Sequence, residues 1–168
     1  MKAIIYTSNT GSTAEYAQLL GKELNLPVHS LQQAKNKVPA GSEIIYLGWI
    51  MAGGIKGYKE AAKLYKVRAV CGVGMGQTGT QLKEVRDKKV IPQRIPLFTL
   101  QGNFDVKKLH GVYRFMMNVM VKTAGKGLAN KTDRTPEEDD MLDMMVNGGK
   151  RVSLQNLKAV TKWYKSVY

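Results

Sequence analysis

The opening stretch of the chain, residues 3–13, constrains its fold more than any other stretch. It reads AIIYTSNTGST, so a short apolar run leads straight into a loop of small hydroxyl, amide and glycine residues. The run is β-branched and aromatic and too short for a helix, which is typical of a strand buried on both faces. A helical pattern begins at Ala14. The sequence therefore predicts an α/β fold with this loop at the carboxyl end of the first strand, where open α/β sheets bind ligands.

The loop has the chemistry of an anion site. Gly11 lets the backbone curl close to a ligand, and the helix that follows presents free N–H groups and its positive dipole end. A triphosphate loop needs a Lys after its last Gly, whereas Ser12 follows Gly11 here. We therefore expect a single phosphate; a helix that is simply capped by Ser and Thr, with no ligand, is the alternative. The residues assigned to the phosphate are Ser8, Asn9, Thr10, Gly11, Ser12 and Thr13.

This six-residue sequence resembles the Ser/Thr-x-Thr-Gly-x-Ser/Thr phosphate loop of the flavodoxins. The resemblance implies FMN, bound without a covalent link through its monophosphate. It also implies a flavodoxin-like three-layer αβα sandwich around a five-stranded parallel sheet in the order 2-1-3-4-5. The length of 168 residues and the 43% hydrophobic content suit a single domain over residues 1–168.

Four further strands are predicted at residues 28–31, 43–49, 67–73 and 95–100, with polar connections at residues 32–42 and a basic, partly helical segment at residues 80–94. In a flavodoxin-like fold, the loops after the last three strands would surround the flavin ring. The residues assigned to the ring are Trp49, Ile50, Met51, Ala52, Gly53 and Gly54, then Gly74, Met75, Gly76, Gln77, Thr78 and Gly79, and finally Gln101, Gly102 and Asn103, with Phe104 next to them.

Within these loops, Gly53 or Gly54 can turn a backbone carbonyl toward the flavin N5. Trp49 either stacks on the ring or faces a covering helix. Residues 74–79 also match the Gly-x-Gly-x-x-Gly dinucleotide fingerprint. That interpretation is disfavoured because the loop follows a late strand, the next segment is short and charged, and Thr99 stands where a ribose-binding acid belongs. We expect these glycines to approach the pyrimidine edge of the flavin instead.

Positive charge gathers in the middle of the chain. The net charge of +13 divides into +1 for residues 1–55, +7 for 56–94, +5 for 95–134 and 0 for 135–168. Such a field favours a redox partner protein with an acidic surface, a small anionic substrate, or peripheral association with an anionic membrane, and nucleic acid is not the expected partner. Electron-carrying flavodoxins are usually acidic, so this charge departs from the family pattern. A solvated basic surface that aids solubility is the alternative.

Residues 106–124 carry an apolar stripe at helical spacing, edged by Lys107, Lys108, Arg114 and Lys122. The stripe is either a helix packed on the core or a Met-rich, basic amphipathic surface beside the flavin or a membrane. Within this segment, His110 is either a proton relay or a surface residue. The stripe consists of Leu109, Val112, Tyr113, Met116, Met117, Met120 and Ala124.

Residues 111–127, GVYRFMMNVMVKTAGKG, also resemble the region after the fifth strand of the bacterial flavodoxin-like protoporphyrinogen oxidases. These enzymes use FMN and pass electrons to a quinone. Two functions therefore stand side by side: an FMN redox protein that serves an anionic partner or substrate, and a quinone-linked protoporphyrinogen IX dehydrogenase. A basic anion-binding module without flavin is a third, non-catalytic hypothesis.

The remaining residues give no catalytic group and no metal site. Cys71 falls within a predicted strand and is expected to be a buried small hydrophobe. Asp139, Asp140 and Asp143 belong to a helix predicted to start at the Thr135-Pro136-Glu137-Glu138 capping signal, where acids favour the helix dipole. Residues 125–133 are expected to form an exposed basic loop, and Ser153 to cap a final helix. With no signal peptide or spanning stretch in the sequence, a cytoplasmic protein is expected.

Overall fold

The computed structural model describes residues 1–103 and 111–168, apart from the side chains of residues 111–114, 116, 117, 120 and 124. Its centre is a sheet of five parallel strands in the order β2-β1-β3-β5-β6. Counted without the short β4, this is the predicted 2-1-3-4-5 order, which is therefore confirmed. The parallel strands are β1 (Ala3–Thr7), β2 (Val28–Ser30), β3 (Glu43–Met51), β5 (Lys66–Gly74) and β6 (Leu97–Gln101).

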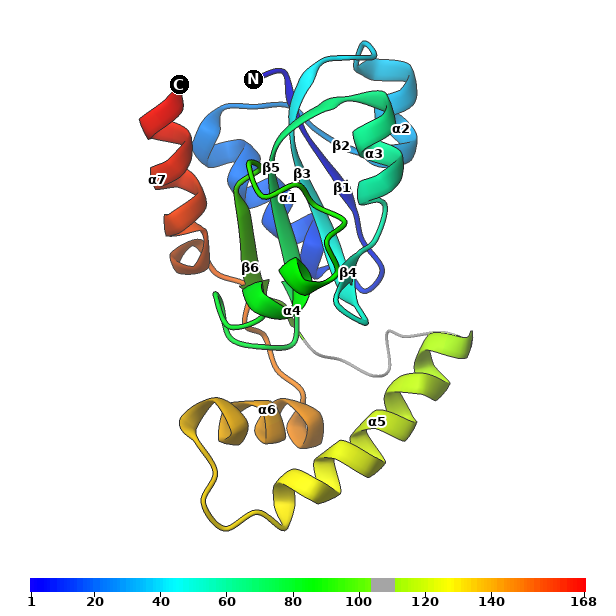
Figure 1. The fold of residues 1–168 in the computed structure, drawn as a ribbon, viewed down its shortest axis with the longest axis vertical. Helices are drawn as coiled ribbons and strands as arrows, with labels where there is room; N and C mark the ends of the chain where they lie inside the picture. Colours follow the sequence, from blue (N-terminus) through cyan, green and yellow to red (C-terminus); the bar gives the residue numbers. More distant parts are fainter. Residues whose placement is uncertain (104–110) are drawn as a thin grey trace.

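Helices cover both faces of the sheet and make three layers (Figure 1). One face packs against α1 (Ser12–Leu24) and α7 (Lys158–Val167), and the other against α2 (Leu31–Lys37), α3 (Tyr58–Leu64) and α4 (Leu82–Asp87). Strand β3 shows why: Ile45 and Leu47 point to the α1 side, while Ile44 and Tyr46 point to the α3 side. Because both faces are covered, the central strands are apolar without alternation.

Strand β3 runs two residues past its predicted end and then reverses. Ile50 and Met51 pair antiparallel with Ile55 and Gly54 of β4 (Gly54–Ile55), and this hairpin was not predicted. Its turn residues, Ala52 and Gly53, both have positive φ, 48° and 71°. That pair of left-handed conformations fits the right-handed twist of the two strands. The ring residues expected in an open exit loop therefore lie largely in a hairpin.

Two other predicted connections are wrong. Residues 32–42 were expected to be a polar connection, but α2 occupies Leu31–Lys37, where Ser30 and Gln33 form a reciprocal capping box. Residues 125–133 were expected to be a loop, but α5 (Gly111–Ala129) continues through their first five positions. In both cases the local sequence is polar, but one residue packs in the protein interior and stabilises the helix. Ala34 is fully buried, and Gly125 is buried near Met145.

After β6 the chain forms a helical pair, α5 and α6 (Pro136–Asn147), which lies beyond the carboxyl ends of the strands (Figure 1). Arg134 joins the two helices, since its guanidinium donates to the Leu128 carbonyl near the end of α5 and contacts Asp139 of α6 at 2.6 Å. The predicted capping box between Thr135 and Glu138 is confirmed.

The final part of the chain consists of the 3-10 turn η2 (Leu154–Leu157) and α7, and Ser153 makes no side-chain cap. The start of the predicted 106–124 helix, Phe104 and His110 lie outside the described residues, as do the side chains of the apolar stripe predicted there. None of the described helices is both long and apolar enough to cross a membrane.

Candidate functional site

The loop between β1 and α1 forms a tight bend around Gly11. Helix α1 starts at Ser12, two residues earlier than expected, and Gly11 precedes it with φ of 103°. A side chain at Gly11 would meet no atom within 4 Å, so the left-handed backbone rather than lack of space calls for glycine here. The Ser8 hydroxyl accepts a hydrogen bond from the Gly11 N–H at 3.2 Å and closes the bend.

The donors of this loop are largely unused by the protein. Helix α1 has no side-chain cap, and its first intrahelical acceptor, the Gly11 carbonyl, pairs with Glu15. The N–H groups of residues 12–14 therefore have no partner among the described residues. Within residues 1–103 and 111–168, the hydroxyls of Thr10 and Thr13 have no hydrogen-bond partner either, although Thr13 is only 2% exposed. Unpaired donors at a helix N-terminus suit an anion with several acceptor oxygens.

Ser12, like Ser8, has a hydroxyl that the protein uses. Its Oγ accepts the Asn103 N–H at 3.0 Å and lies 3.4 Å from the Asn103 carbonyl oxygen. The Ser12 hydroxyl therefore ties α1 to the segment after β6, while its backbone N–H still faces the bend. Ser8, Asn9, Thr10, Gly11, Ser12 and Thr13 thus stay together as predicted, and their assignment to a phosphate stays a prediction.

A hydrogen-bonded contact at Thr7, just before this loop, was not predicted. The Tyr46 hydroxyl lies 2.7 Å from Thr7 Oγ1 and 2.7 Å from the Lys56 carbonyl oxygen, so it links the middle of β3 to the end of β1 and to the segment before α3. Gly57, with φ of 77°, makes room for it: a Cβ there would lie 2.1 Å from the Tyr46 oxygen. Burial raises the pKa of Tyr46 to about 12, which keeps this hydroxyl neutral. The residues involved are separated in sequence, and no local pattern indicates the contact.

The β3–β4 hairpin is the second candidate loop. Ile50 packs against the core on the α3 side, whereas the ammonium of Lys56 lies over the Trp49 ring at 5.7 Å from its centroid. At the turn, a Cβ on Gly53 would lie 2.7 Å from Cε of Lys88, so the turn is seated against the residue that follows α4. The hairpin is therefore a fixed wall rather than a free loop, and a carbonyl facing the flavin N5 stays a prediction.

The loop of residues 74–79 folds back onto β6. The Gly79 N–H donates to the Thr99 carbonyl at 3.0 Å, and Thr78 Oγ1 accepts the Gln101 N–H at 3.1 Å. The side chain of Gln81 accepts the Gly76 N–H, and α4 has only six residues and begins at Leu82. The glycine pattern thus does not open a helix at its last Gly, as a dinucleotide site requires, which agrees with the preference for a flavin-contacting loop.

The third loop behaves differently, because its side chains are used by the protein. Gln101 is the last residue of β6, and its amide donates to Asp140 of α6 at 2.5 Å. Asn103 accepts the N–H groups of Arg151 and Val152 at 2.7 and 3.0 Å and donates to Glu15 at 3.0 Å. Gly102 donates its N–H to the Gly74 carbonyl. These three residues form a joint between the sheet, α1 and the segment after α6.

The three aspartates noted in the sequence form ion pairs within the protein, and the cysteine lies in the core. Asp140 and Asp143 contact the Arg151 guanidinium at 3.3 and 3.0 Å, and Asp139 contacts Arg134. Cys71 is fully buried as predicted, and burial raises the pKa of its thiol to about 12, so it is not a nucleophile.

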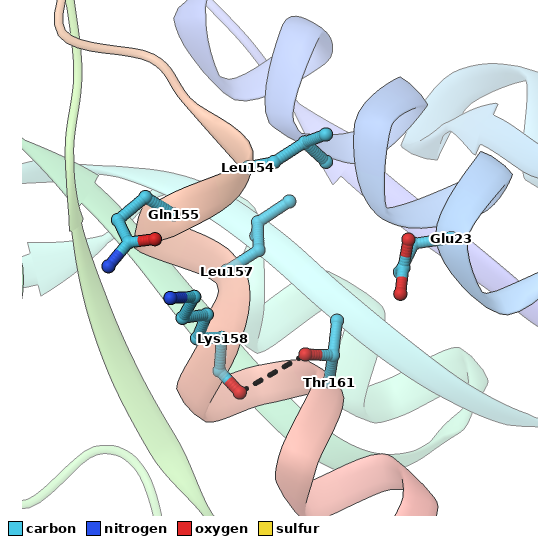
Figure 2. Close-up of a pocket in the computed structure, with 6 residues that line it drawn as sticks. All are labelled: Glu23, Leu154, Gln155, Leu157, Lys158 and Thr161. Atoms are coloured by element: carbon cyan, nitrogen blue, oxygen red, sulfur yellow. Dashed lines mark hydrogen bonds between the residues drawn. The ribbon is translucent and has the colours of Figure 1, made fainter.

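A groove on the α1 and α7 side lies away from all these loops (Figure 2). It encloses about 230 Å³ and is reached past Glu23, which belongs to the last turns of α1 and so to the end opposite the phosphate loop. The groove contains none of the predicted ligand residues. The side chains that line it are Glu23, Leu154, Gln155, Leu157, Lys158 and Thr161.

A match to a known protein family covers most of the described fold. A family model described as a flavodoxin domain matches residues 3–131, which run from β1 to just past the end of α5. No curated protein and no solved structure gave a significant match. The match begins at the strand that leads into the phosphate loop and spans every parallel strand of the sheet. The chain therefore belongs to the flavodoxin family.

Proposed function

We propose that this protein binds FMN through the β1–α1 loop and transfers electrons through it. The observation that carries the proposal is the set of unused donors at the start of α1: the N–H groups of residues 12–14 and the hydroxyls of Thr10 and Thr13. A phosphate monoester presents several acceptor oxygens and a charge of about −1.5 to −2 at pH 7. Flavodoxin domains typically bind FMN, so the donors and the family agree.

The loops after β3 and β5 also fit FMN, because they are placed where its flavin ring would lie. The β3–β4 hairpin and the loop of residues 74–79 stand at the carboxyl ends of adjacent strands and would flank the flavin ring. Both make contacts with the rest of the protein: Lys88 lies against the hairpin turn, and the Gln101 N–H of β6 donates to Thr78 of the second loop. Bound FMN would supply the redox chemistry, while the protein binds it, orients it and limits its contact with water.

The test is to purify the protein under native conditions, denature it and identify any released flavin by chromatography. We expect FMN at about one equivalent, rather than riboflavin or FAD. Anaerobic reduction of the holoprotein, followed by absorbance, then shows whether electrons enter singly or in pairs. If no flavin is released and the apoprotein takes up none, the proposal fails and an anion-binding module without flavin replaces it.

A second candidate, a quinone-linked protoporphyrinogen IX dehydrogenase, is favoured by the helical pair after β6. Helix α5 exposes Phe115 and Val119, 69% and 45% accessible, beside the exposed Lys122 and Lys126. An apolar surface among cations suits a hydrophobic acceptor and an anionic substrate. The test is anaerobic turnover of protoporphyrinogen IX with and without a quinone. Turnover that requires quinone favours the enzyme, and no turnover with a fully loaded flavoprotein favours the carrier.

A further inference from the structure

Many of the cations of residues 56–94 belong to α3, to α4 and to the segment after α4, and both helices lie on the same face of the sheet. This segment carries a net charge of +7. Six of its cations are exposed and take part in no ion pair among the described residues. Lys66 begins β5, and the other five lie in α3 or in the segment after α4. We call these five the basic face. They are Lys59, Lys63, Lys88, Lys89 and Arg94.

These cations form one surface rather than scattered charges. Both α3 and α4 lie on the same face of the sheet (Figure 1). Burial raises the pKa of Tyr58, at the start of α3, and the positive charges of Arg94 and Arg86 oppose that rise, which places both arginines near this end of α3. The cations of the two segments therefore reinforce one another.

The acids of this side do not neutralise the surface. Glu60 contacts Lys35 at 2.6 Å and Asp87 contacts Lys83 at 2.7 Å, so each already compensates another cation. Glu84 accepts a hydrogen bond from the side chain of Gln81, keeps its charge and lies with Lys88 at the Gly53 turn, so it offsets one of the five cations. The basic face therefore stays positive, with five cations against this one acid.

The segment that carries three of these cations is held in place. Arg86 donates to the carbonyl oxygens of Ile91, Pro92 and Ile95 at 3.4, 3.1 and 2.7 Å, and the Ile91 side chain is only 4% exposed. The cations on either side of this anchor are therefore presented from a fixed backbone, which lowers the entropic cost of binding a partner.

The basic face begins at the edge of the candidate ring site. The side chain of Lys88 packs against the Gly53 turn of the β3–β4 hairpin, one of the two walls expected to flank the flavin. By contrast, residues 135–168, which include α6 and α7, carry no net charge. Positive charge therefore approaches the proposed ring from the hairpin side.

We propose that the basic face is the docking surface for an acidic protein that exchanges electrons with the bound flavin. The inference rests on the proposed function for its electron-transfer step, and on charge complementarity for the choice of partner. A protein fits better than a membrane because Val90, 39% exposed, is the one large exposed hydrophobe between residues 56 and 103. Membrane-surface elements need a broad apolar face, whereas a transient protein interface needs a small apolar centre within a polar rim.

The test uses cytochrome b5, an acidic electron acceptor, and cytochrome c, a basic one, with the dithionite-reduced holoprotein in a stopped-flow instrument. We expect the rate with cytochrome b5 to fall steeply as salt is added, and the rate with cytochrome c to rise or stay flat. The variant K59E/K89E should slow cytochrome b5 at low salt about tenfold or more. The matched control K158E/K162E changes the same net charge on exposed positions of α7 and should have an effect of threefold or less.

Equal effects of the two double variants would overturn the proposal, because net charge alone would then explain the rate. Amide chemical shifts, followed while oxidised cytochrome b5 is added to flavin-free protein, test docking without electron transfer. Shifts clustered on residues 56–64 and 86–94 support the basic face even if the proposed function fails, and shifts elsewhere or none overturn it. If phosphatidylserine vesicles bind the wild type but not K59E/K89E while cytochrome b5 shifts nothing, the surface is a membrane site and the proposal is wrong.

Discussion

Two loops at the carboxyl end of the sheet, residues 8–13 after β1 and residues 101–103 after β6, lie side by side but use their polar groups differently. In the part of the chain that the structure describes, the first has no partner for its threonine hydroxyls or for the N–H groups of the first turn of α1. The second directs its side chains to α1, α6 and the backbone of Arg151 and Val152. Two loops at the same end of a sheet can therefore differ in how many polar groups they leave for a ligand. On this ground the phosphate is proposed for residues 8–13, while the side chains of residues 101 and 103 serve the protein.

The largest expected effect is a loss of unfolding free energy when Asn103, in the joint formed by residues 101–103, is replaced. Asn103→Ala removes the acceptor of the Arg151 and Val152 N–H groups, both partly buried. Leaving two such donors without a partner should lower the free energy of unfolding by about 2–4 kcal/mol. Urea denaturation followed by circular dichroism measures it. Asn103→Asp keeps the acceptor but replaces the donor to Glu15 with a second carboxylate, so it should lose about 1–2 kcal/mol, less than Asn103→Ala. A stable Asn103→Ala protein with weakened FMN binding would instead make residue 103 a ligand residue.

The protein should lose stability at alkaline pH because of Tyr46, whose hydroxyl is hydrogen-bonded to Thr7 just before the first loop. Tyr46 is buried, and its pKa is raised to about 12 in the folded protein against an ordinary value of about 10. The unfolded chain therefore loses its proton first, and stability falls between about pH 10 and 12 by about 2–3 kcal/mol from this group. Unfolding free energies measured across this range should flatten in Tyr46→Phe. The same slope in wild type and variant would show that Tyr46 does not titrate as expected.

Thr13→Val separates ligand binding from stability. The change keeps the shape of a nearly buried side chain and removes a hydroxyl that has no partner in the described part of the protein. We expect unfolding free energy to change by less than about 0.5 kcal/mol. A lost hydrogen bond to a charged phosphate should weaken FMN binding by about 1.5–3 kcal/mol, or roughly 10- to 100-fold. Quenching of flavin fluorescence measures affinity, and unchanged affinity would remove Thr13 from the phosphate site.

The smallest effect is expected at Ser8, which supports the bend through an exposed hydrogen bond to the Gly11 N–H. Ser8→Ala should weaken FMN binding by about 0.5–1 kcal/mol, or two- to fivefold, because the bend is also fixed by the backbone of Gly11. The same titration measures it. A loss as large as that of Thr13→Val would mean that the Ser8 hydroxyl contacts the phosphate itself.

The contrast between the loops also explains what could be predicted from the sequence. The phosphate loop consists of consecutive residues between a strand and a helix, so a local pattern contains its whole chemistry. The partners of Asn103 lie 48, 49 and 88 positions away. No local pattern includes such distances, so these contacts could not be predicted, and the assignment of Gln101, Gly102 and Asn103 to the flavin ring stays a prediction.

The strands were predictable because they are continuous apolar runs, and their order followed from the resemblance to flavodoxins. Some connections were not predicted. Helix α2 carries a capping-box signal, Ser30 with Gln33, which could have been recognised. The β3–β4 turn has Ala52 at φ of 48°, a conformation that alanine rarely adopts, and only the pairing of Met51 with Gly54 explains it. The conformation of this turn is therefore set by the pairing of β3 with β4, which the local sequence does not indicate.

The central claim is that the β1–α1 loop holds one phosphate and thereby tethers a flavin. The most direct measurement is a titration of the flavin-free protein with FMN and, in parallel, with riboflavin, which differs from FMN only by the phosphate. We predict one site that binds FMN at least 100-fold more tightly, with most of this difference lost in a Thr10→Val/Thr13→Val variant. Equal affinity for the two flavins, or no binding of either, would contradict the account.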